Sequence, residues 1–401
     1  MKKRIPPAGG PPRVALLIET ASSYGRGLLK GIAQYAALRG PWSFFLEPGG
    51  LEGPVPRLGD WGIRGIIALL RSRRLAGEVL SMGVPTVDLD FALPELAPWG
   101  VVHDERAVGR LVAEHLLRCG LAHFAFCGWS SPGDPRGFWW ESARFGGFVE
   151  GLGPRGAAVR VYGRPRRPED RVWAREQKGL AQWLRDLPRP VGVFACNDQR
   201  ARHVLEAARL AGVAIPRDAA VIGVDNDEVL CEMSTPSLSS VKLDAARLGF
   251  EGAAVLHRLM EGQRLPRRPA VIRPVGVVQR QSTDTLASGD AVTQEALRYI
   301  RGNATRPIRV YDVLRAAGVS RRTLETRFRR ALGITPHEEI LRVRLERACG
   351  FLAETEWPLK RVAAASGFSY PEHMHAVFRQ ELGVTPGDYR AARRGEGGYP
   401  G

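Results

Sequence analysis

The sequence predicts an α/β protein of two lobes, each built on a doubly wound parallel sheet, followed by an all-α domain with two helix-turn-helix units. Three observations predict this architecture. Short apolar runs alternate with amphipathic segments through the first 280 residues. The β-like runs then disappear, and the last 110 or so residues are helical patterns separated by Gly and Pro. Within this helical tail, one motif occurs twice, 49 residues apart.

Six apolar runs of about six residues each, nearly free of charge, occur in the first 280 residues. Such runs are typical of parallel strands that helices cover on both faces. The expected strands are residues 14–19, 65–70, 85–90, 123–128, 191–196 and 220–225. Helical patterns are expected between them at residues 27–38, 105–119, 140–151, 173–187, 199–211 and 245–261. This alternation of strand and helix predicts a parallel α/β architecture.

So many strand–helix units exceed what one small open sheet needs, so we expect two lobes with a cleft between them. Ligands of open parallel sheets bind at the carboxyl ends of the strands. Asp, Asn and Arg side chains bond sugar hydroxyls, and an aromatic ring covers the apolar C–H side of a sugar. Such residues follow the runs or open helices, at Ser22, Ser23, Tyr24, Asp88, Asp90, Asp104, Trp140, Arg144, Asn197, Asp198, Asp225 and Asn226.

The chain divides into five expected parts. Residues 1–12 are a basic, Pro/Gly-rich tail, and residues 13–280 are the two-lobed domain. The polar segment 281–290 reads as a linker by its composition. Residues 291–394 are the helical domain, and residues 395–401 are a second disordered tail.

Composition excludes several classes of protein. The five cysteines are scattered, without a C-x-x-C pair or a zinc-type His cluster, which favours buried free thiols and no metal or cofactor. No signal peptide or run of about eighteen apolar residues occurs, so we expect a cytoplasmic protein without membrane contact. The net charge of +16 favours a polyanionic partner such as nucleic acid. Less than a third of that excess lies after residue 280, so motifs must locate the partner's site.

The helical repeat has the features of a helix-turn-helix. Each copy gives a short apolar helix, a turn glycine (Gly318 or Gly367), a serine, a second helix that reaches Phe-Arg, and then L-G-x-T-P. The second copy carries one extra residue before Phe378. Glycine suits the turn, and Ser320 and Ser369 are expected as N-caps of the second helices.

In the first copy, Val319, Leu324 and Phe328 share one helical face and are expected to pack inward. Arg321, Arg322, Glu325 and Arg329 then point outward, toward the major groove of DNA. A plain helical bundle with charged, solvated faces is the alternative interpretation, and the second copy of the motif argues against it.

Residues 292–390 resemble the DNA-binding domain of the AraC/XylS family, whose second half is matched by G-F-S at Gly367, Phe378–Arg379 and L-G-V-T-P-G-D-Y-R. His373 and Met374 stand where the family usually has an aromatic pair. The resemblance implies two major-groove contacts joined by a long helix at about residues 337–352. The implied DNA-contacting residues are Ser320, Arg321, Arg322, Thr323, Glu325, Thr326, Arg329, Ser369, Tyr370, Glu372, His373, His375 and Arg379.

The first 280 residues are similar to the LacI-type, periplasmic-binding-protein-like effector domain, through V-V-H-D-E-R-A-V-G-R, F-A-C-N-D-Q-R-A and V-I-G-V-D-N-D-E. The resemblance implies sugar contacts at Ser23, Tyr24, Asp104, Trp140, Arg144, Asn197, Asp198 and Asp225. A sensor followed by AraC-type units resembles the xylose-responsive members of the AraC/XylS family. It implies D-xylose or a related sugar as effector, operator DNA as partner, a homodimer, and RNA polymerase contact if the protein is an activator.

Other interpretations stay open. Asp198 is also a candidate N-cap, Asp225 and Asn226 are candidates for a turn, and Trp140 is a candidate core residue. The effector is alternatively a different sugar, polyol or sugar acid. An enzyme is a remote alternative, since G-R-G-L-L-K-G at residues 25–31 has the wrong spacing for a dinucleotide site and suits close packing of a helix on the sheet. A plain sugar-binding protein is opposed by the helical repeat.

Overall fold

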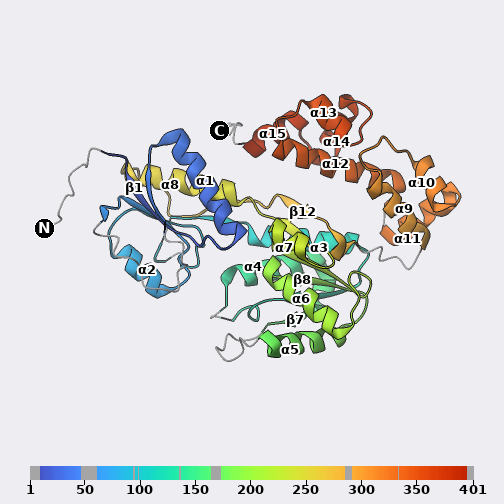
Figure 1. The fold of residues 1–401 in the computed structure, drawn as a ribbon, viewed down its shortest axis with the longest axis horizontal. Helices are drawn as coiled ribbons and strands as arrows, with labels where there is room; N and C mark the ends of the chain where they lie inside the picture. The colour runs from blue at the N-terminus through green and yellow to red at the C-terminus, as the bar shows by residue number, and fades with distance from the viewer. Residues whose placement is uncertain are drawn as a thin grey trace. The chain divides into compact units, whose positions relative to one another are not determined.

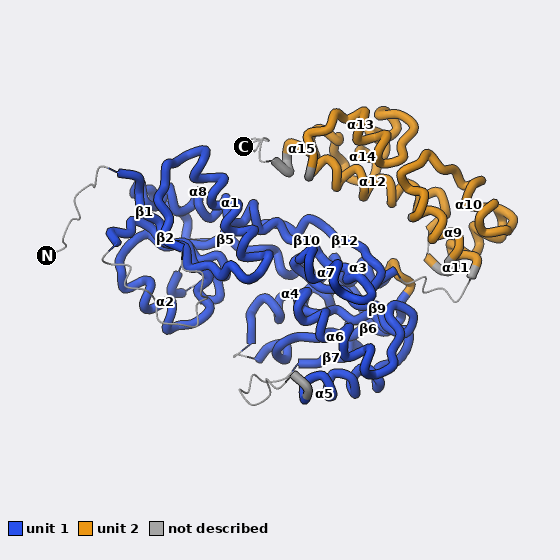
Figure 2. Tube along the Cα trace, viewed as in Figure 1, with its two compact units in different colours: residues 1–117, 121–285 blue, residues 118–120, 286–401 orange. Residues whose placement is uncertain are grey.

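The computed structural model describes residues 10–46, 61–93, 95–97, 99–134, 137–163, 173–284, 291–332 and 334–394. Contacts divide the chain into two compact units, residues 1–117 with 121–285, and residues 118–120 with 286–401 (Figure 2). Residues 1–9 and 395–401 of the predicted tails, and 285–290 of the predicted linker, lie outside the described residues. The first unit therefore holds both lobes, and the second holds the helical repeat.

The first lobe is a four-stranded parallel sheet in the order β2-β1-β3-β4. Its strands are β1 (Arg13–Leu17), β2 (Ser43–Leu46), β3 (Gly65–Ala68) and β4 (Thr86–Asp88). Helices α1 (Ser23–Arg39) and α8 (Ala245–Met260) pack on one face of the sheet, and α2 (Arg73–Leu80) packs on the other. This is the doubly wound arrangement that the sequence predicts.

Helices α1 and α8 lie side by side in close backbone contact (Figure 1). A Cβ added to Gly31 would lie 1.8 Å from the carbonyl oxygen of Ala246, and one added to Gly249 would lie 2.1 Å from that of Leu28. Only glycine allows this approach. The small residues at positions 25–31 thus serve close packing, as expected, but the partner at Gly31 is a second helix rather than the sheet.

The second lobe is a six-stranded sheet in the order β12-β10-β9-β8-β6-β7, parallel except for β12. Its strands are β6 (His123–Cys127), β7 (Arg160–Tyr162), β8 (Val191–Ala195), β9 (Ala219–Asp225), β10 (Ser239–Lys242) and β12 (Gly276–Val278). Its helices are α3 (Glu105–Arg118), α4 (Trp139–Leu152), α5 (Trp173–Arg185), α6 (Asp198–Ala211), α7 (Glu228–Met233) and the 3-10 turn at Gly153–Ala158.

Three segments connect the lobes. They run from β5 (Val101–His103) to α3, from β10 to α8, and from β11 (Ala270–Ile272) to β12. Strands β5 and β11 pair in parallel, and the amide of Asp104 donates to the carbonyl of Ile272 at 2.9 Å. The amide of Val275 donates to the carbonyl of Lys242 at 2.9 Å. The connections are therefore hydrogen-bonded to one another where the lobes meet, and the two-lobed α/β prediction is confirmed.

Residues 281–283, which the sequence assigns to the linker, belong instead to the second lobe. They form a 3-10 helix, Gln281–Thr283, in which Ser282 and Thr283 are buried. The hydroxyl of Ser282 donates to the carbonyl of Val221 at 2.6 Å. The polar side chains of residues 281–283 suggested a linker, but Ser282 and Thr283 form buried hydrogen bonds within the lobe.

The second unit consists of α9 (Ala291–Gly302), α10 (Val310–Ala317), α11 (Arg321–Leu332), α12 (Pro336–Glu354), α13 (Leu359–Ala365), α14 (Pro371–Leu382) and α15 (Pro386–Arg394). Two cores lie within it, one built around Leu324 and Phe328 and the other around Met374 and Phe378. Helix α12 contributes to both cores and so joins the two helix-turn-helix units, as expected for the long helix predicted at about residues 337–352. At the start of α12, Thr335 and Glu338 form a capping box.

Within the described part of the chain, no helix combines the length and the apolar composition needed to cross a membrane. All five cysteines are free thiols; four are buried and Cys349 is half-buried. This agrees with the interpretation of the cysteines as small apolar side chains.

Candidate functional site

A buried ion pair lies in the second lobe where it meets the first. Nε and Nη2 of Arg144 donate to the carboxylate of Glu105 at 2.6 and 3.3 Å, and Nη1 donates to the carbonyl of Cys196 at 2.5 Å. Helix α4 supplies Arg144 and the first residue of α3 is Glu105, so two helices fix the pair. The Arg144 guanidinium also lies 4.7 Å from the centre of the Trp140 ring. Because Glu105 and Asp225 surround it, its pKa is raised despite burial.

Asp225 ends β9 beside this pair. Its backbone has φ of 110°, and that of the next residue, Asn226, has φ of 50°. Two consecutive side-chain-bearing residues in the left-handed region are costly, and such strain clusters at functional sites. Burial and the nearby carboxylate of Glu105 raise the pKa of Asp225 to about 7, against the opposing effect of Arg144. A carboxyl group that is partly protonated at neutral pH both donates and accepts hydrogen bonds.

The first lobe contributes Tyr24, Arg71 and Asp90. Ser22 caps α1 by accepting from the amide of Gly25, and this places Tyr24 in the first turn. Burial raises the pKa of the Tyr24 hydroxyl, and Glu105, Asp90 and Asp225 raise it further. The guanidinium of Arg71 lies 3.7 Å from the carboxylate of Asp90. Tyr24 therefore lies among charged groups from both lobes.

The indole Nε1 of Trp139 donates to the backbone carbonyl of Asp90 at 2.8 Å, a direct bond between the lobes. The ring of Trp140 stacks on Phe138, with centres 5.1 Å apart, and is half-buried. The polar and aromatic residues that meet at this boundary form what we call the interlobe cluster: Tyr24, Arg71, Asp90, His103, Glu105, Trp139, Trp140, Arg144 and Asp225.

Four other predicted sugar contacts lie at helix starts. Asp104 accepts from the amide of Ala107 at 2.8 Å, and Asn197 accepts from the amide of Arg200 at 2.9 Å, so both are N-caps. Asp198 is buried and accepts from Ser240, Asp227 and Cys231. Ser23 is the first residue of α1, half-buried, beside the Ser22 cap. For Asp104, Asn197 and Asp198 the structure thus supplies a structural role, and their contact with sugar stays a prediction.

Sequence reasoning missed His103, Glu105 and Arg71. His103 is buried, and neither ring nitrogen makes a well-formed hydrogen bond within the described residues. Its ring centre lies 5.9 Å from that of Tyr24. Burial and Arg144 lower its pKa to about 3, so the imidazole is neutral near pH 7. For His103 and Glu105 the available signal was the V-V-H-D-E run at residues 101–105, in which only Asp104 was predicted to contact sugar.

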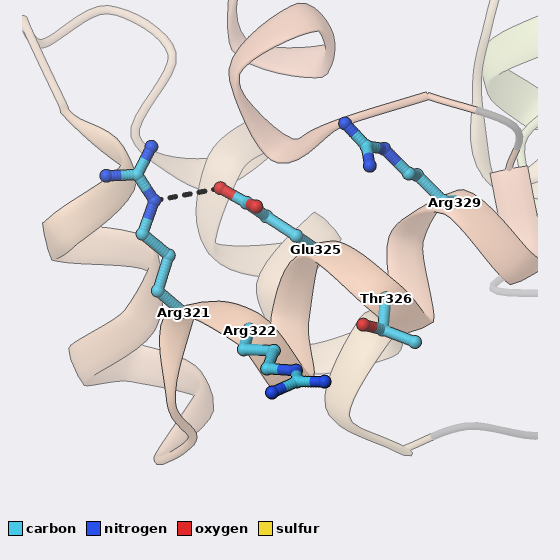
Figure 3. A pocket seen from close by; sticks show the side chains of 5 residues that line it. All are labelled: Arg321, Arg322, Glu325, Thr326 and Arg329. Atoms are coloured by element: carbon cyan, nitrogen blue, oxygen red, sulfur yellow. Dashed lines mark hydrogen bonds and ion pairs between the residues drawn. The ribbon is translucent and has the colours of Figure 1, made fainter.

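In the second unit, α10 and α11 form the first helix-turn-helix. Gly318 ends α10 with φ of 65°, and Ser320 caps α11 by accepting from the amide of Thr323 at 3.2 Å. Leu324 and Phe328 are fully buried and Val319 packs beside them, as predicted. A hollow on the opposite face is lined by Arg321, Arg322, Glu325, Thr326 and Arg329 (Figure 3). Figure 3 shows Arg321 paired with Glu325, at 2.8 Å, while Arg322 extends separately.

The second helix-turn-helix, α13 and α14, corrects one prediction. Helix α14 begins at Pro371 with Tyr370 as its N-cap residue, so Ser369 is not the cap. The extra residue of this copy therefore lies in the turn, and the two second helices align from Arg321 and Pro371 onward. In this alignment Met374 and Phe378 occupy the buried positions of Leu324 and Phe328.

The remaining predicted contacts of α14 differ in exposure. Glu372 and Arg379 are exposed, and so is Tyr370 in the turn. His375 and His373 are half-buried, and the ring of His373 packs against Phe368 at 5.6 Å. Met374 thus fills the core position that the family usually gives to an aromatic residue, while His373 packs at its edge. The outward face of α14 is less basic than that of α11.

Comparisons with known proteins match both units. The model of a periplasmic binding protein-like domain matches residues 113–283, and that of a helix-turn-helix domain matches residues 313–392. The xylose operon regulatory protein of Escherichia coli strain K12 is 30% identical over 384 residues, which is 94% of this chain and 96% of that protein. That of Haemophilus influenzae strain Rd is 29% identical over 384 residues, with 94% and 98% covered.

A solved structure described as the xylose-binding transcription activator xylR is 29% identical and aligns with a TM-score of 0.59. The alignment covers 95% of this chain and 98% of that one. The order of a two-lobed domain followed by paired helix-turn-helix units is therefore shared over nearly the whole length. The chain belongs to the family of the xylose operon regulatory proteins.

Proposed function

We propose that this protein is a sugar-responsive, sequence-specific transcription regulator whose effector is D-xylose or a closely related pentose. The observation that carries the sugar site is the buried Arg144–Glu105 pair beside Asp225, with Trp140 under the guanidinium. It offers donors, acceptors and a ring face to one small polyhydroxylated ligand. The name of the relatives, xylose operon regulatory protein, supports the choice of sugar.

The charge of the interlobe cluster favours a neutral sugar or polyol over a sugar acid. Both guanidiniums already face carboxylates, Arg144 that of Glu105 and Arg71 that of Asp90. Asp225 adds a third carboxyl group. A ligand carboxylate placed here would find both guanidiniums already paired, whereas hydroxyl groups bond to either partner of each pair.

Operator DNA is the proposed macromolecular partner, contacted by the exposed faces of α11 and α14. The basic face of α11, with Arg321, Arg322 and Arg329, suits guanine edges and phosphates. The relatives are named as regulators, so the proposal assigns no catalytic residue. By family membership we further propose a homodimer that activates transcription through RNA polymerase.

The proposed mechanism is a two-state switch. Sugar binds between the lobes, stabilises their closed arrangement, and so alters how the DNA-binding units of a dimer engage their sites. The sugar shifts this equilibrium only by its differential affinity for the closed state.

A direct test selects DNA duplexes from a random-sequence pool with the full chain, with and without D-xylose, and measures their affinities. We expect a preferred site whose affinity depends on D-xylose and not on D-gluconate. Affinity that no sugar changes would contradict the sensor, and the absence of any preferred sequence would contradict the regulator.

A further inference from the structure

The last residues of the sensor before the connection to the DNA-binding unit are held by buried hydroxyl groups. Thr283 Oγ1 lies 2.7 Å from Ser239 Oγ and 2.8 Å from His115 Nε2. The amide of Ser239 donates to Ser282 Oγ at 2.8 Å, and the amide of Arg280 donates to Ser239 Oγ at 2.7 Å. Ser239, Ser282 and Thr283 are all fully buried. Residues 280–283 therefore form an anchored segment, which we call the exit anchor.

Arg280 links the exit anchor to the interlobe cluster. Its Nη1 donates to the side-chain oxygen of Asn226 at 2.9 Å and to the carbonyl of Leu238 at 3.0 Å. Asn226 directly follows Asp225, and both residues have positive φ. One side chain thus spans from the segment that leads to the DNA-binding unit to the residue next to the proposed sugar contact.

The other side of the Asp225–Asn226 turn is held by Asp198. Its carboxylate accepts from Ser240 Oγ at 2.5 Å and from the amide of Asp227 at 2.8 Å, and Ser240 Oγ in turn accepts from the amide of Asn226 at 3.0 Å. A Cβ on Gly223 would lie 2.3 Å from Asp198 Oδ1, so glycine there makes room for the carboxylate. Asp198 and Ser240 therefore hold the backbone of the Asp225–Asn226 turn, while the side chain of Asn226 bonds to Arg280.

We propose that Arg280 is a positioning residue that couples sugar occupancy at Asp225 to the exit anchor, and through it to DNA binding. A hydrogen bond from a sugar hydroxyl to Asp225 changes which backbone geometry of the turn is favoured. Since Asn226 is the next residue, its side-chain oxygen shifts with that geometry, and the bond to Arg280 passes the shift to residues 280–283. The inference rests on the proposed sugar site.

A purely structural role for Arg280 makes a different prediction. If the bond only stabilises the sensor, its loss lowers the melting temperature but leaves the effect of sugar on DNA affinity unchanged. A coupling role instead lowers the ratio of DNA affinities with and without sugar, while the affinity for sugar itself stays nearly constant.

The experiment uses the full chain as wild type, Arg280→Gln, Asn226→Ala, the double variant and Arg280→Lys. Arg267→Gln is the matched control, because it removes one positive charge from an exposed residue of the same unit. Calorimetry gives the D-xylose affinity, and fluorescence anisotropy gives the affinity for the wild type's selected duplex with and without saturating D-xylose. A melting curve of each variant shows that it is folded.

We expect the wild-type ratio of DNA affinities to be on the order of 5- to 150-fold. This ratio falls below about threefold in Arg280→Gln and in Asn226→Ala. In the double variant the ratio falls no further than in either single variant, because both changes remove the same bond. Arg267→Gln keeps the wild-type ratio. Arg280→Lys, which retains a donor, recovers part of the ratio. D-xylose affinity changes by less than about threefold in Arg280→Gln, Arg280→Lys and Arg267→Gln.

A wild-type ratio in Arg280→Gln overturns the inference and leaves the proposed function intact. Parallel loss of D-xylose affinity and of the ratio also overturns it, since Arg280 then acts on the cluster alone. If Arg280→Gln does not fold, Asn226→Ala decides instead: a wild-type ratio of DNA affinities in that variant overturns the inference. A wild type that does not respond to D-xylose contradicts the proposed pentose effector itself.

Discussion

Trp139 and Asp90 join the two lobes: the indole N–H of Trp139, at the start of α4, donates to the backbone carbonyl of Asp90, beyond the end of β4, at 2.8 Å. The acceptor belongs to the main chain just after β4, so its position does not depend on a side-chain rotamer. The bond lies beside the Arg71–Asp90 pair and close to Tyr24. It therefore reports on the relative position of the lobes at the proposed sugar site.

Trp139→Phe keeps most of the aromatic side chain and removes this bond. One such hydrogen bond contributes about 0.5–1.5 kcal/mol. We expect calorimetry to show D-xylose affinity weakened by about 2- to 13-fold, because the bond stabilises the arrangement that holds the sugar. Trp183→Phe in α5, a half-buried residue packed against the core of the second lobe, is the control. Equal D-xylose affinities of Trp139→Phe and Trp183→Phe would show that the Trp139–Asp90 bond does not contribute to sugar binding.

The Arg144–Glu105 pair separates stability from sugar binding. Arg144→Met leaves Glu105 buried without its partner, which costs about 3–5 kcal/mol of the free energy of unfolding. Adding Glu105→Leu removes the orphaned carboxylate, so we expect denaturant titrations to show most of that loss recovered. Neither variant should bind D-xylose. A double variant with restored stability and wild-type sugar affinity would show that the pair is only structural.

Asp225 predicts a dependence of stability on pH. Burial raises its pKa from 3.8 to about 7, so the folded protein binds this proton more tightly than the unfolded chain. Its contribution to stability is fully present below about pH 4 and is lost as pH rises through about 7. We expect the wild type to lose more melting temperature than Asp225→Asn between pH 6 and pH 8, while the variant binds D-xylose more weakly. Parallel melting profiles would contradict the raised pKa.

Arg322 and Arg321 differ on the exposed face of α11. Arg321 is paired with Glu325 at 2.8 Å, whereas Arg322 extends separately (Figure 3). If Arg322 contacts a base, Arg322→Ala weakens the preferred duplex by about 1–3 kcal/mol and relaxes the preference at one position. Anisotropy on duplexes changed one base pair at a time checks this. A loss of equal size on every duplex makes Arg322 a phosphate contact.

The two turn glycines of the DNA-binding unit form a matched pair. Both have positive φ, 65° at Gly318 and 79° at Gly367. A Cβ at Gly318 meets nothing within 4 Å, but one at Gly367 would lie 2.3 Å from the carbonyl oxygen of Ala304. Gly318→Ala should therefore cost about 1 kcal/mol of backbone strain, and Gly367→Ala clearly more. Denaturant titrations of the full chain measure the free energy of unfolding of each variant, with a fluorophore on Cys349 to follow the second unit. Equal losses of this free energy in the two variants would contradict the close approach at Gly367.

The predicted strands and long helices agree with the structure because their signals are local. Apolar runs of six residues and helical periodicity can be recognised without knowledge of the tertiary contacts, as in β8 and α6. Strands β5 and β11, of three residues each, lie outside the predicted runs because they form by pairing between distant segments of the chain. Ser369 was misplaced as a cap because one inserted residue shifts a helix start without changing its composition.

The candidate site was harder to predict, since the same side chains that bond sugars also cap helices. Asp104 and Asn197 fit both roles by sequence, and the structure shows both capping. Glu105 was overlooked because its importance comes from Arg144, 39 residues away in the chain. Arg144 itself was expected from the family resemblance. Pairings of this kind follow from the fold of the lobe rather than from any local pattern.

The most direct test of the sensor is the melting temperature of the full chain titrated with D-xylose, D-ribose, L-arabinose, D-glucose and D-gluconate. A ligand that binds only the folded state raises the melting temperature by mass action. We predict a dose-dependent rise with D-xylose, a smaller one with related pentoses, none with D-gluconate, and no rise with any of them in Arg144→Met with Glu105→Leu. A wild-type melting temperature that no sugar changes would contradict the account.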